Sequence, residues 1–200
     1  MARAYTMRQT GAVAAHAARD ITRWLKAKPE TRQVRNVEAD PDYQRRDIDL
    51  IWKTKNGTTT IEVKGDRYDQ TGNFFLETIS NREAGTPGCF LYTEADFIYY
   101  YFVGPQRLFI LPLPATRDWF LAHLREFREV TTTTPYRGGF YTTVGRLVKI
   151  ERVLGAVSGA QCVELREALK APGWLSPSLA SWLAKIQFWK RPAGRRSADY

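Results

Sequence analysis

A strand–turn–strand segment is the feature that most constrains the fold of this chain. Residues 48–52 have an apolar strand pattern, Lys55-Asn56-Gly57 supplies turn residues, and residues 58–64 alternate and are rich in β-branched side chains. An Asn-Gly turn between two strand patterns is typical of a β-hairpin. We therefore expect the two segments to pair, and we expect the fold to contain a sheet built around them.

Three charged residues interrupt this apolar hairpin. Asp49 lies in the first strand, and Glu62 and Lys64 lie in the second. Residues two apart on a strand point to the same face, and pairing of the strands brings Asp49 towards them. Buried charges are costly unless they bind something, and Mg²⁺ takes hard oxygen ligands. One interpretation is a Mg²⁺ site formed by Asp49, Glu62 and the Val63 carbonyl; the alternative is a surface hairpin with an ordinary Glu–Lys cross-strand pair.

Beyond the hairpin, the hydrophobic pattern predicts one early helix, several further strands and helices towards the end. This order indicates an α/β domain, with α+β as the alternative, in which helices flank a mixed central β-sheet. We expect helices over 9–27, 116–127, 161–170 and from 176 onward, strands over 34–37, 73–80, 89–93, 97–103, 107–113 and 145–150, and a loop over 131–139.

Length and charge suggest one main domain with a basic appendage. The 200 residues suit a domain over 1–155 and a small helical C-terminal extension with a basic tail over 156–200. The net charge of +9 divides into +1 for residues 1–100 (15 basic, 14 acidic) and +8 for residues 101–200 (15 basic, 7 acidic). A basic half favours a polyanionic partner, with nucleic acid first among the candidates.

Several classes of protein are not expected. Cys89 and Cys162 have no metal-binding spacing, and with His16 and His123 as the only histidines a Cys/His zinc site is not predicted. No apolar run approaches the roughly 18 residues of a membrane span, and the N-terminus lacks the apolar stretch of a signal peptide. We expect a soluble, reduced, cytoplasmic protein with no membrane partner.

The charged hairpin resembles the PD-(D/E)XK nuclease superfamily, which includes restriction endonucleases and Holliday junction resolvases. The resemblance starts at Asp47-Ile48-Asp49-Leu50 and Ile61-Glu62-Val63-Lys64-Gly65-Asp66 and continues through residues 71–77, Gly88 and residues 93–97. It covers roughly residues 10–110 and is similar to a phage or bacterial subgroup. The superfamily motif loosely includes a proline directly before the first aspartate. This chain does not match that feature, because Asp47-Ile48 precede Asp49.

The resemblance implies a restriction endonuclease-like core and a metal-dependent nuclease. Asp49 and Glu62 are then metal ligands for Mg²⁺ or Mn²⁺, and Lys64 is the catalytic lysine that positions the attacking water and stabilises charge on a phosphate. Superfamily members commonly add one more acidic ligand. The candidates for it are Asp20 in the first helix, Glu38 after the short strand, and Glu77.

The leading hypothesis is thus a Mg²⁺-dependent nuclease that hydrolyses phosphodiester bonds in DNA, in a resolvase-like or a restriction-like manner, with a homodimer as one arrangement. The alternatives are a catalytically inactive nucleic-acid-binding module on the same fold and an interaction protein that docks a partner. The residues expected to contact nucleic acid are Arg67, Gln70, Arg137, Lys190, Arg191, Arg195 and Arg196.

Overall fold

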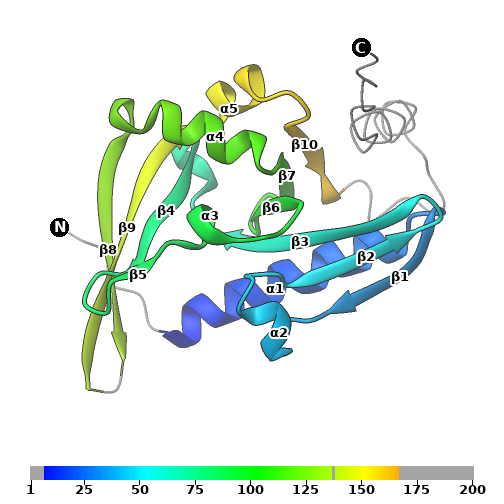
Figure 1. The fold of residues 1–200 in the computed structure, drawn as a ribbon, viewed down its shortest axis with the longest axis horizontal. Coiled ribbons are helices and arrows are strands. Elements are labelled where there is room, and N and C mark those ends of the chain that lie inside the picture. The colour runs from blue at the N-terminus through cyan, green and yellow to red at the C-terminus, as the bar shows by residue number, and fades with distance from the viewer. Residues whose placement is uncertain (1–6, 137, 167–200) are drawn as a thin grey trace, which may run out of the picture.

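The computed structural model describes residues 7–136 and 138–166, which form two β-sheets and the helices around them (Figure 1). The predicted helix from 176 and five of the predicted nucleic-acid contacts lie outside the described residues. These contacts are Arg137, Lys190, Arg191, Arg195 and Arg196.

The larger sheet is mixed and has six strands in the order β1-β2-β3-β6-β7-β10. The strands β3 and β6 run parallel, whereas the other neighbours are antiparallel. The predicted α/β class, with a mixed central sheet and flanking helices, is therefore confirmed. The strands are β1 (Thr31–Asn36), β2 (Leu50–Thr54), β3 (Gly57–Asp66), β6 (Phe97–Phe102), β7 (Arg107–Pro112) and β10 (Gln161–Glu164).

The helix α1 (Met7–Lys26) covers one face of the six-stranded sheet (Figure 1). Its apolar residues recur at helical spacing, so they form one stripe that faces the strands. This stripe packs against alternate residues of β3 and β6, which makes the first hydrophobic core. Its buried members include Ala17, Ile21, Trp24 and Leu25 from α1, with Ile61, Val63, Tyr99 and Tyr101 from the strands.

The smaller sheet has four antiparallel strands in the order β5-β4-β9-β8. They are β4 (Asn73–Asn81), β5 (Thr86–Pro87), β8 (Arg128–Tyr136) and β9 (Gly139–Lys149). The predicted loop over 131–139 is wrong, because residues 131–136 belong to β8 and pair with β9 along their length. The threonines of this segment are β-branched and therefore good strand formers, which outweighs the glycines that follow them.

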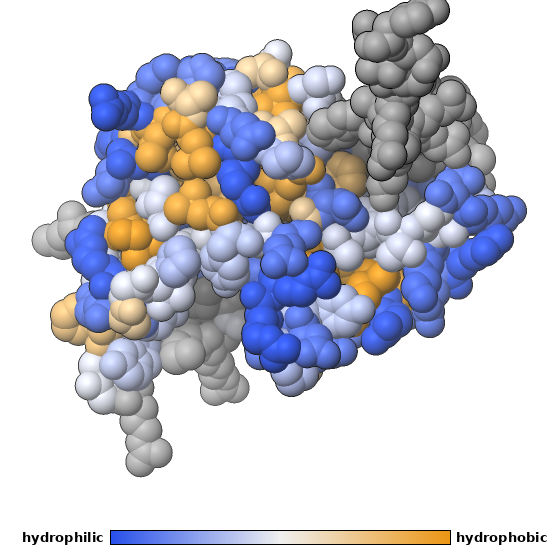
Figure 2. Space-filling model, in the orientation of Figure 1, coloured by the Kyte–Doolittle hydropathy of each residue, from blue (hydrophilic) through white to orange (hydrophobic). Residues whose placement is uncertain are grey.

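A second core joins the two sheets on the face opposite α1. It contains Phe74 from β4, Tyr100 and Phe102 from β6 and Phe109 from β7. The rings of Phe74 and Phe109 meet edge to face with centroids 5.1 Å apart. Three helices close this core, namely α3 (Cys89–Tyr92), α4 (Ala115–Ala122) and α5 (Ile150–Ala156). Figure 2 shows apolar side chains gathered over the region of α4, whereas the surface around α2 (Pro41–Gln44) is hydrophilic.

Two further expectations are corrected by the structure. The predicted strand over 89–93 is wrong, because this segment forms the short helix α3. In four residues the spacing of apolar side chains cannot distinguish a helix from a strand. The predicted helix over 161–170 begins instead as β10, which pairs with β7 and completes the edge of the six-stranded sheet. Residues 161–164 therefore belong to the central sheet and not to a helical extension that begins at residue 156.

Within the described part of the chain, no helix has both the length and the apolar character needed to cross a membrane.

Candidate metal centre and adjoining groove

The pairing of β2 with β3 places Asp49 beside Glu62. Leu50 lies opposite Ile61, and the Asp49 N–H donates to the Ile61 carbonyl at 3.0 Å. The Val63 N–H in turn donates to Asp49 Oδ2 at 2.8 Å. Because Ile61 and Val63 pack into the α1 core, the alternation of β3 directs Glu62 to the opposite face. The predicted proximity of Asp49 and Glu62 is therefore seen in the structure.

Glu62 is a buried carboxylate with an unused oxygen. Its side chain is 7% exposed, and within residues 7–136 and 138–166 its Oε2 has no hydrogen-bond partner. Burial, followed by the charges of Asp49 and Asp47, raises the pKa of Glu62 well above its usual value. The carboxyl cluster is thus short of positive charge, which a bound cation would supply.

Asp47 joins this cluster although the sequence analysis did not include it among the site residues. It has a φ of 54°, a left-handed conformation that aspartate tolerates better than most residues. The Thr93 hydroxyl donates to the Asp47 carbonyl at 2.6 Å, and the Tyr92 hydroxyl donates to Asp47 Oδ1 at 3.3 Å. Its Oδ2 is buried and unpartnered among the described residues. Burial, with a smaller contribution from Asp49, raises the pKa of Asp47 to about 6.

Cys89 is the second site residue that sequence reasoning missed. It begins α3, and single ligand atoms of Asp47, Glu62 and Cys89 all lie within 4.8 Å of one another. The spacing of Cys89 and Cys162 matches no metal motif, so neither cysteine was expected at the site. The fold brings Cys89 to the hairpin through a contact between the α3 and β4 segments. The only local signal is that it follows Gly88, a residue of the resemblance.

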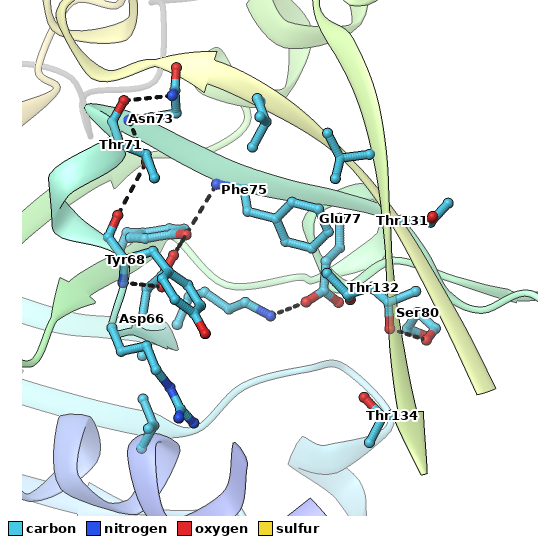
Figure 3. A pocket seen from close by; sticks show the side chains of 18 of the residues that line it. Asp66, Tyr68, Thr71, Asn73, Phe75, Glu77, Ser80, Thr131, Thr132 and Thr134 are labelled. Atoms are coloured by element: carbon cyan, nitrogen blue, oxygen red, sulfur yellow. Dashed lines mark hydrogen bonds and ion pairs between the residues drawn. The ribbon is translucent and has the colours of Figure 1, made fainter. Parts of the chain in front are cut away.

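Lys64 lies on the same face of β3 as Glu62 and forms an ion pair with Glu77 Oε1. Its side chain is 28% exposed and that of Glu77 is 14% exposed, so the pair is only partly open to solvent. Burial disfavours the charged amine, but the negative groups around it, Glu77 first, outweigh this effect and raise the pKa of Lys64. In Figure 3 a dashed line marks this ion pair, which ends at the Glu77 carboxylate. Lys64 is therefore held as a charged ammonium beside the carboxyl cluster.

The three candidates for an additional acidic ligand have different locations. Asp20 lies on the α1 side of the sheet, where Oδ2 accepts from the Tyr101 hydroxyl at 2.8 Å, so the sheet separates it from Glu62. Glu38 is exposed, and its charge contributes to raising the pKa of Asp49 behind the larger effect of burial. Glu77 is engaged by Lys64. The structure thus does not bring Asp20 to the site, and it puts Asp47 there instead.

A groove of about 820 Å³ adjoins the Lys64–Glu77 pair. One wall comes from the end of β3 and the segment that leads to β4, and the other comes from β8 and β9, as Figure 3 shows for Asp66, Tyr68, Thr131 and Thr132. Threonine hydroxyls and the basic residues Arg67 and Arg128 are among its lining groups. Of the two described residues predicted to contact nucleic acid, Arg67 lines this groove, whereas Gln70 is exposed outside it.

The site therefore combines buried, electron-rich carboxylates with a fixed ammonium at the edge of a polar groove. Such a set can bind a divalent cation and can place a positive charge against an anionic substrate group. Comparison with known proteins adds no assignment, since no family model, no curated protein and no solved structure matches the chain.

Proposed function

We propose that this protein is a metal-dependent nuclease of the PD-(D/E)XK type that hydrolyses phosphodiester bonds in DNA. One observation carries the proposal: Glu62 Oε2 is buried without a partner in the described residues, beside Asp49 and on the same strand face as Lys64. A surface hairpin with an ordinary Glu–Lys pair would not bury such an oxygen. The mixed sheet with α1 on one face supports the restriction endonuclease-like core at a coarser level.

In the proposed reaction Asp49 and Glu62 hold the cation, and the Val63 carbonyl remains a predicted third oxygen ligand. Mg²⁺ or Mn²⁺ held by these residues would supply a Lewis acid for the phosphate and would lower the pKa of a bound water. The Val63 N–H fixes Asp49 Oδ2 at 2.8 Å, which orients this carboxylate towards Glu62. The two acids are thereby positioned before any ligand arrives, so little reorganisation is needed on binding.

Lys64 acts on the substrate side of the carboxyl cluster. Its ammonium stabilises negative charge on the scissile phosphate, and Glu77 positions the ammonium through their ion pair. The groove beside this pair holds the sugar–phosphate backbone, with Arg67 and Arg128 supplying positive charge along its walls. The +8 charge of residues 101–200 supports a polyanionic substrate.

A cleavage assay with matched lysine variants tests the proposal. Linear, branched and single-stranded DNA are incubated with the wild-type chain, Lys64→Ala and Lys53→Ala, in Mg²⁺, Mn²⁺ or EDTA. Lys53 is an exposed lysine on the same hairpin and serves as the control. We expect metal-dependent cleavage by the wild type and by Lys53→Ala. Lys64→Ala should cleave about 10²–10³-fold more slowly, which is the range for loss of one group that stabilises the transition state.

The same assay discriminates the alternatives. DNA binding without cleavage in either metal would contradict the nuclease and favour the inactive nucleic-acid-binding module. Absence of DNA binding at low salt would contradict both and favour an interaction protein. Preferential cleavage of branched DNA would support a resolvase-like activity, whereas cleavage at discrete sites in linear DNA would support a restriction-like one.

A further inference from the structure

We propose that Cys89 is a sulfur ligand in this metal centre, together with Asp47 and Glu62, and that the centre therefore prefers a thiophilic divalent ion such as Zn²⁺ or Co²⁺ to Mg²⁺. This inference deepens the proposed function and rests on it through Glu62, which belongs to both ligand sets. It assigns two ligands, Asp47 and Cys89, that the nuclease resemblance does not supply.

The separation of the three ligand atoms supports one shared ion. Atoms bound to a single Zn²⁺-sized ion at about 2.0–2.3 Å lie at most about 4.5 Å apart. One oxygen of Asp47, one oxygen of Glu62 and Cys89 Sγ already lie within 4.8 Å of one another. Small side-chain rotations are therefore sufficient to close the set around an ion.

The unused oxygens provide a second, independent indication of a ligand. Glu62 is 7% exposed, and both its Oε2 and Asp47 Oδ2 are buried without a partner among the residues that the structure describes. Burying an unpartnered carboxylate oxygen costs free energy that a hydrogen-bonded neighbour would remove. A cation bound between Glu62 and Asp47 would give both of these oxygens a partner.

The backbone also fixes the position of Cys89. Gly88, immediately before it, donates its N–H to the Thr78 carbonyl at 3.0 Å, and a Cβ at Gly88 would lie 2.3 Å from the Glu77 carbonyl oxygen. This close approach fixes the start of α3 against β4, with Cys89 Sγ within 4.8 Å of ligand oxygens of Asp47 and Glu62. Main-chain contacts with β4 thus fix the backbone that carries Cys89.

The chemistry of sulfur determines which ion is preferred. The thiol loses its proton to solvent as the sulfur–metal bond forms. Thiolates favour Zn²⁺ and similar ions, whereas Mg²⁺ takes oxygen ligands almost exclusively. A centre that adds one thiolate to its carboxylate ligands therefore favours the transition metal over Mg²⁺.

Cobalt(II) provides a direct probe, because a thiolate bound to it gives a charge-transfer absorption in the near ultraviolet. The full chain, Cys89→Ser and Cys162→Ser are each titrated with Co²⁺ and separately with Zn²⁺. Cys162 is the matched control, since it is the other cysteine of the chain and lies exposed on β10. Circular dichroism of each variant confirms that it is folded.

We expect the wild type and Cys162→Ser to show the absorption, and Cys89→Ser to lose it and to bind Zn²⁺ more than about tenfold more weakly. If the wild type shows no thiolate band, or Cys162→Ser loses it, the inference is overturned. If Cys89→Ser does not fold, the comparison of the wild type with Cys162→Ser still shows whether Cys89 binds the ion, because the chain has two cysteines.

The failure of this inference and the failure of the proposed function can be distinguished. A chain that binds Co²⁺ through Cys89 but cleaves no DNA would contradict the nuclease alone. Mg²⁺-dependent cleavage without the thiolate band would contradict this inference alone.

Discussion

At the scale of the residue, the crowding of Asp47, Asp49 and Glu62 has a cost in the metal-free protein. Burial is the largest cause that raises the pKa values of all three carboxyl groups. For Asp47 and Glu62, repulsion from the neighbouring carboxylates raises the pKa further. Functional sites commonly hold such unfavourable charge, and the rest of the fold compensates for it. The stability of the metal-free protein is therefore informative about the site.

We predict that Glu62→Gln stabilises the metal-free protein. The substitution keeps the shape of the side chain and removes a carboxyl group whose charged form is disfavoured in the folded protein, so the free energy of unfolding in EDTA should rise by about 1 kcal/mol. Added Zn²⁺ or Mn²⁺ should then raise the melting temperature of the wild type and leave that of the variant nearly unchanged. Denaturant titration and thermal melting measure both effects.

Glu151→Gln is the matched control for this prediction, because Glu151 is exposed on α5. We expect its free energy of unfolding to differ from that of the wild type by less than about 0.5 kcal/mol. A Glu62→Gln variant that is less stable than the wild type in EDTA would contradict the account of a charge-crowded site.

At the scale of the element, the contact between α3 and β4 decides where Cys89 lies. We predict that Gly88→Ala destabilises the protein by about 1–3 kcal/mol, because its Cβ would lie 2.3 Å from the Glu77 carbonyl oxygen and the backbone would have to shift. The same shift should weaken the cobalt–thiolate absorption. Equilibrium unfolding and the Co²⁺ titration provide the two measurements.

Gly155→Ala in α5 is the control, since no atom lies within 4 Å of a Cβ built there. Alanine is the better helix former, so this variant should be as stable as the wild type or more stable by up to about 1 kcal/mol. Equal stability of Gly88→Ala and Gly155→Ala would show that the α3–β4 approach does not constrain the chain.

Elements with a long, distinctive pattern could be predicted from the sequence, and short ones could not. The helix α1 and the β2–β3 hairpin follow from apolar spacing and from the Asn56-Gly57 turn. The elements α3 and β10 have four residues each, so their local pattern is uninformative and long-range packing decides their conformation. Asp49 and Glu62 could be paired in advance because one hairpin carries both, whereas Cys89 reaches them only through tertiary contacts.

At the scale of the whole molecule, an aromatic core connects the central sheet to the smaller sheet. Phe74 is fully buried and contacts Tyr100, Phe102 and Phe109 across this interface. The groove uses walls from both sheets, so its shape depends on this packing. Stability and groove geometry are therefore coupled through one set of side chains.

We predict that Phe74→Ala lowers the free energy of unfolding by about 3–5 kcal/mol, the usual cost of truncating a buried phenylalanine. Phe74→Leu should cost less, because it fills more of the cavity. Chemical denaturation of both variants measures the difference. Equal losses for the two substitutions would contradict the packing role, as would a change below about 1 kcal/mol for alanine.

The central claim is that the buried carboxylates beside Lys64 support metal-dependent hydrolysis of DNA. Its most direct test is the cleavage rate of wild type and Glu62→Gln on the same DNA as Mg²⁺, Mn²⁺, Co²⁺ or Zn²⁺ is increased from an EDTA-treated start. The account predicts that wild-type cleavage rises with at least one of these ions, while Glu62→Gln, although folded and no less stable, stays at the EDTA background. Wild-type cleavage that persists unchanged in EDTA, a Glu62→Gln variant that cleaves at the wild-type rate, or no cleavage with any of the four ions would contradict it.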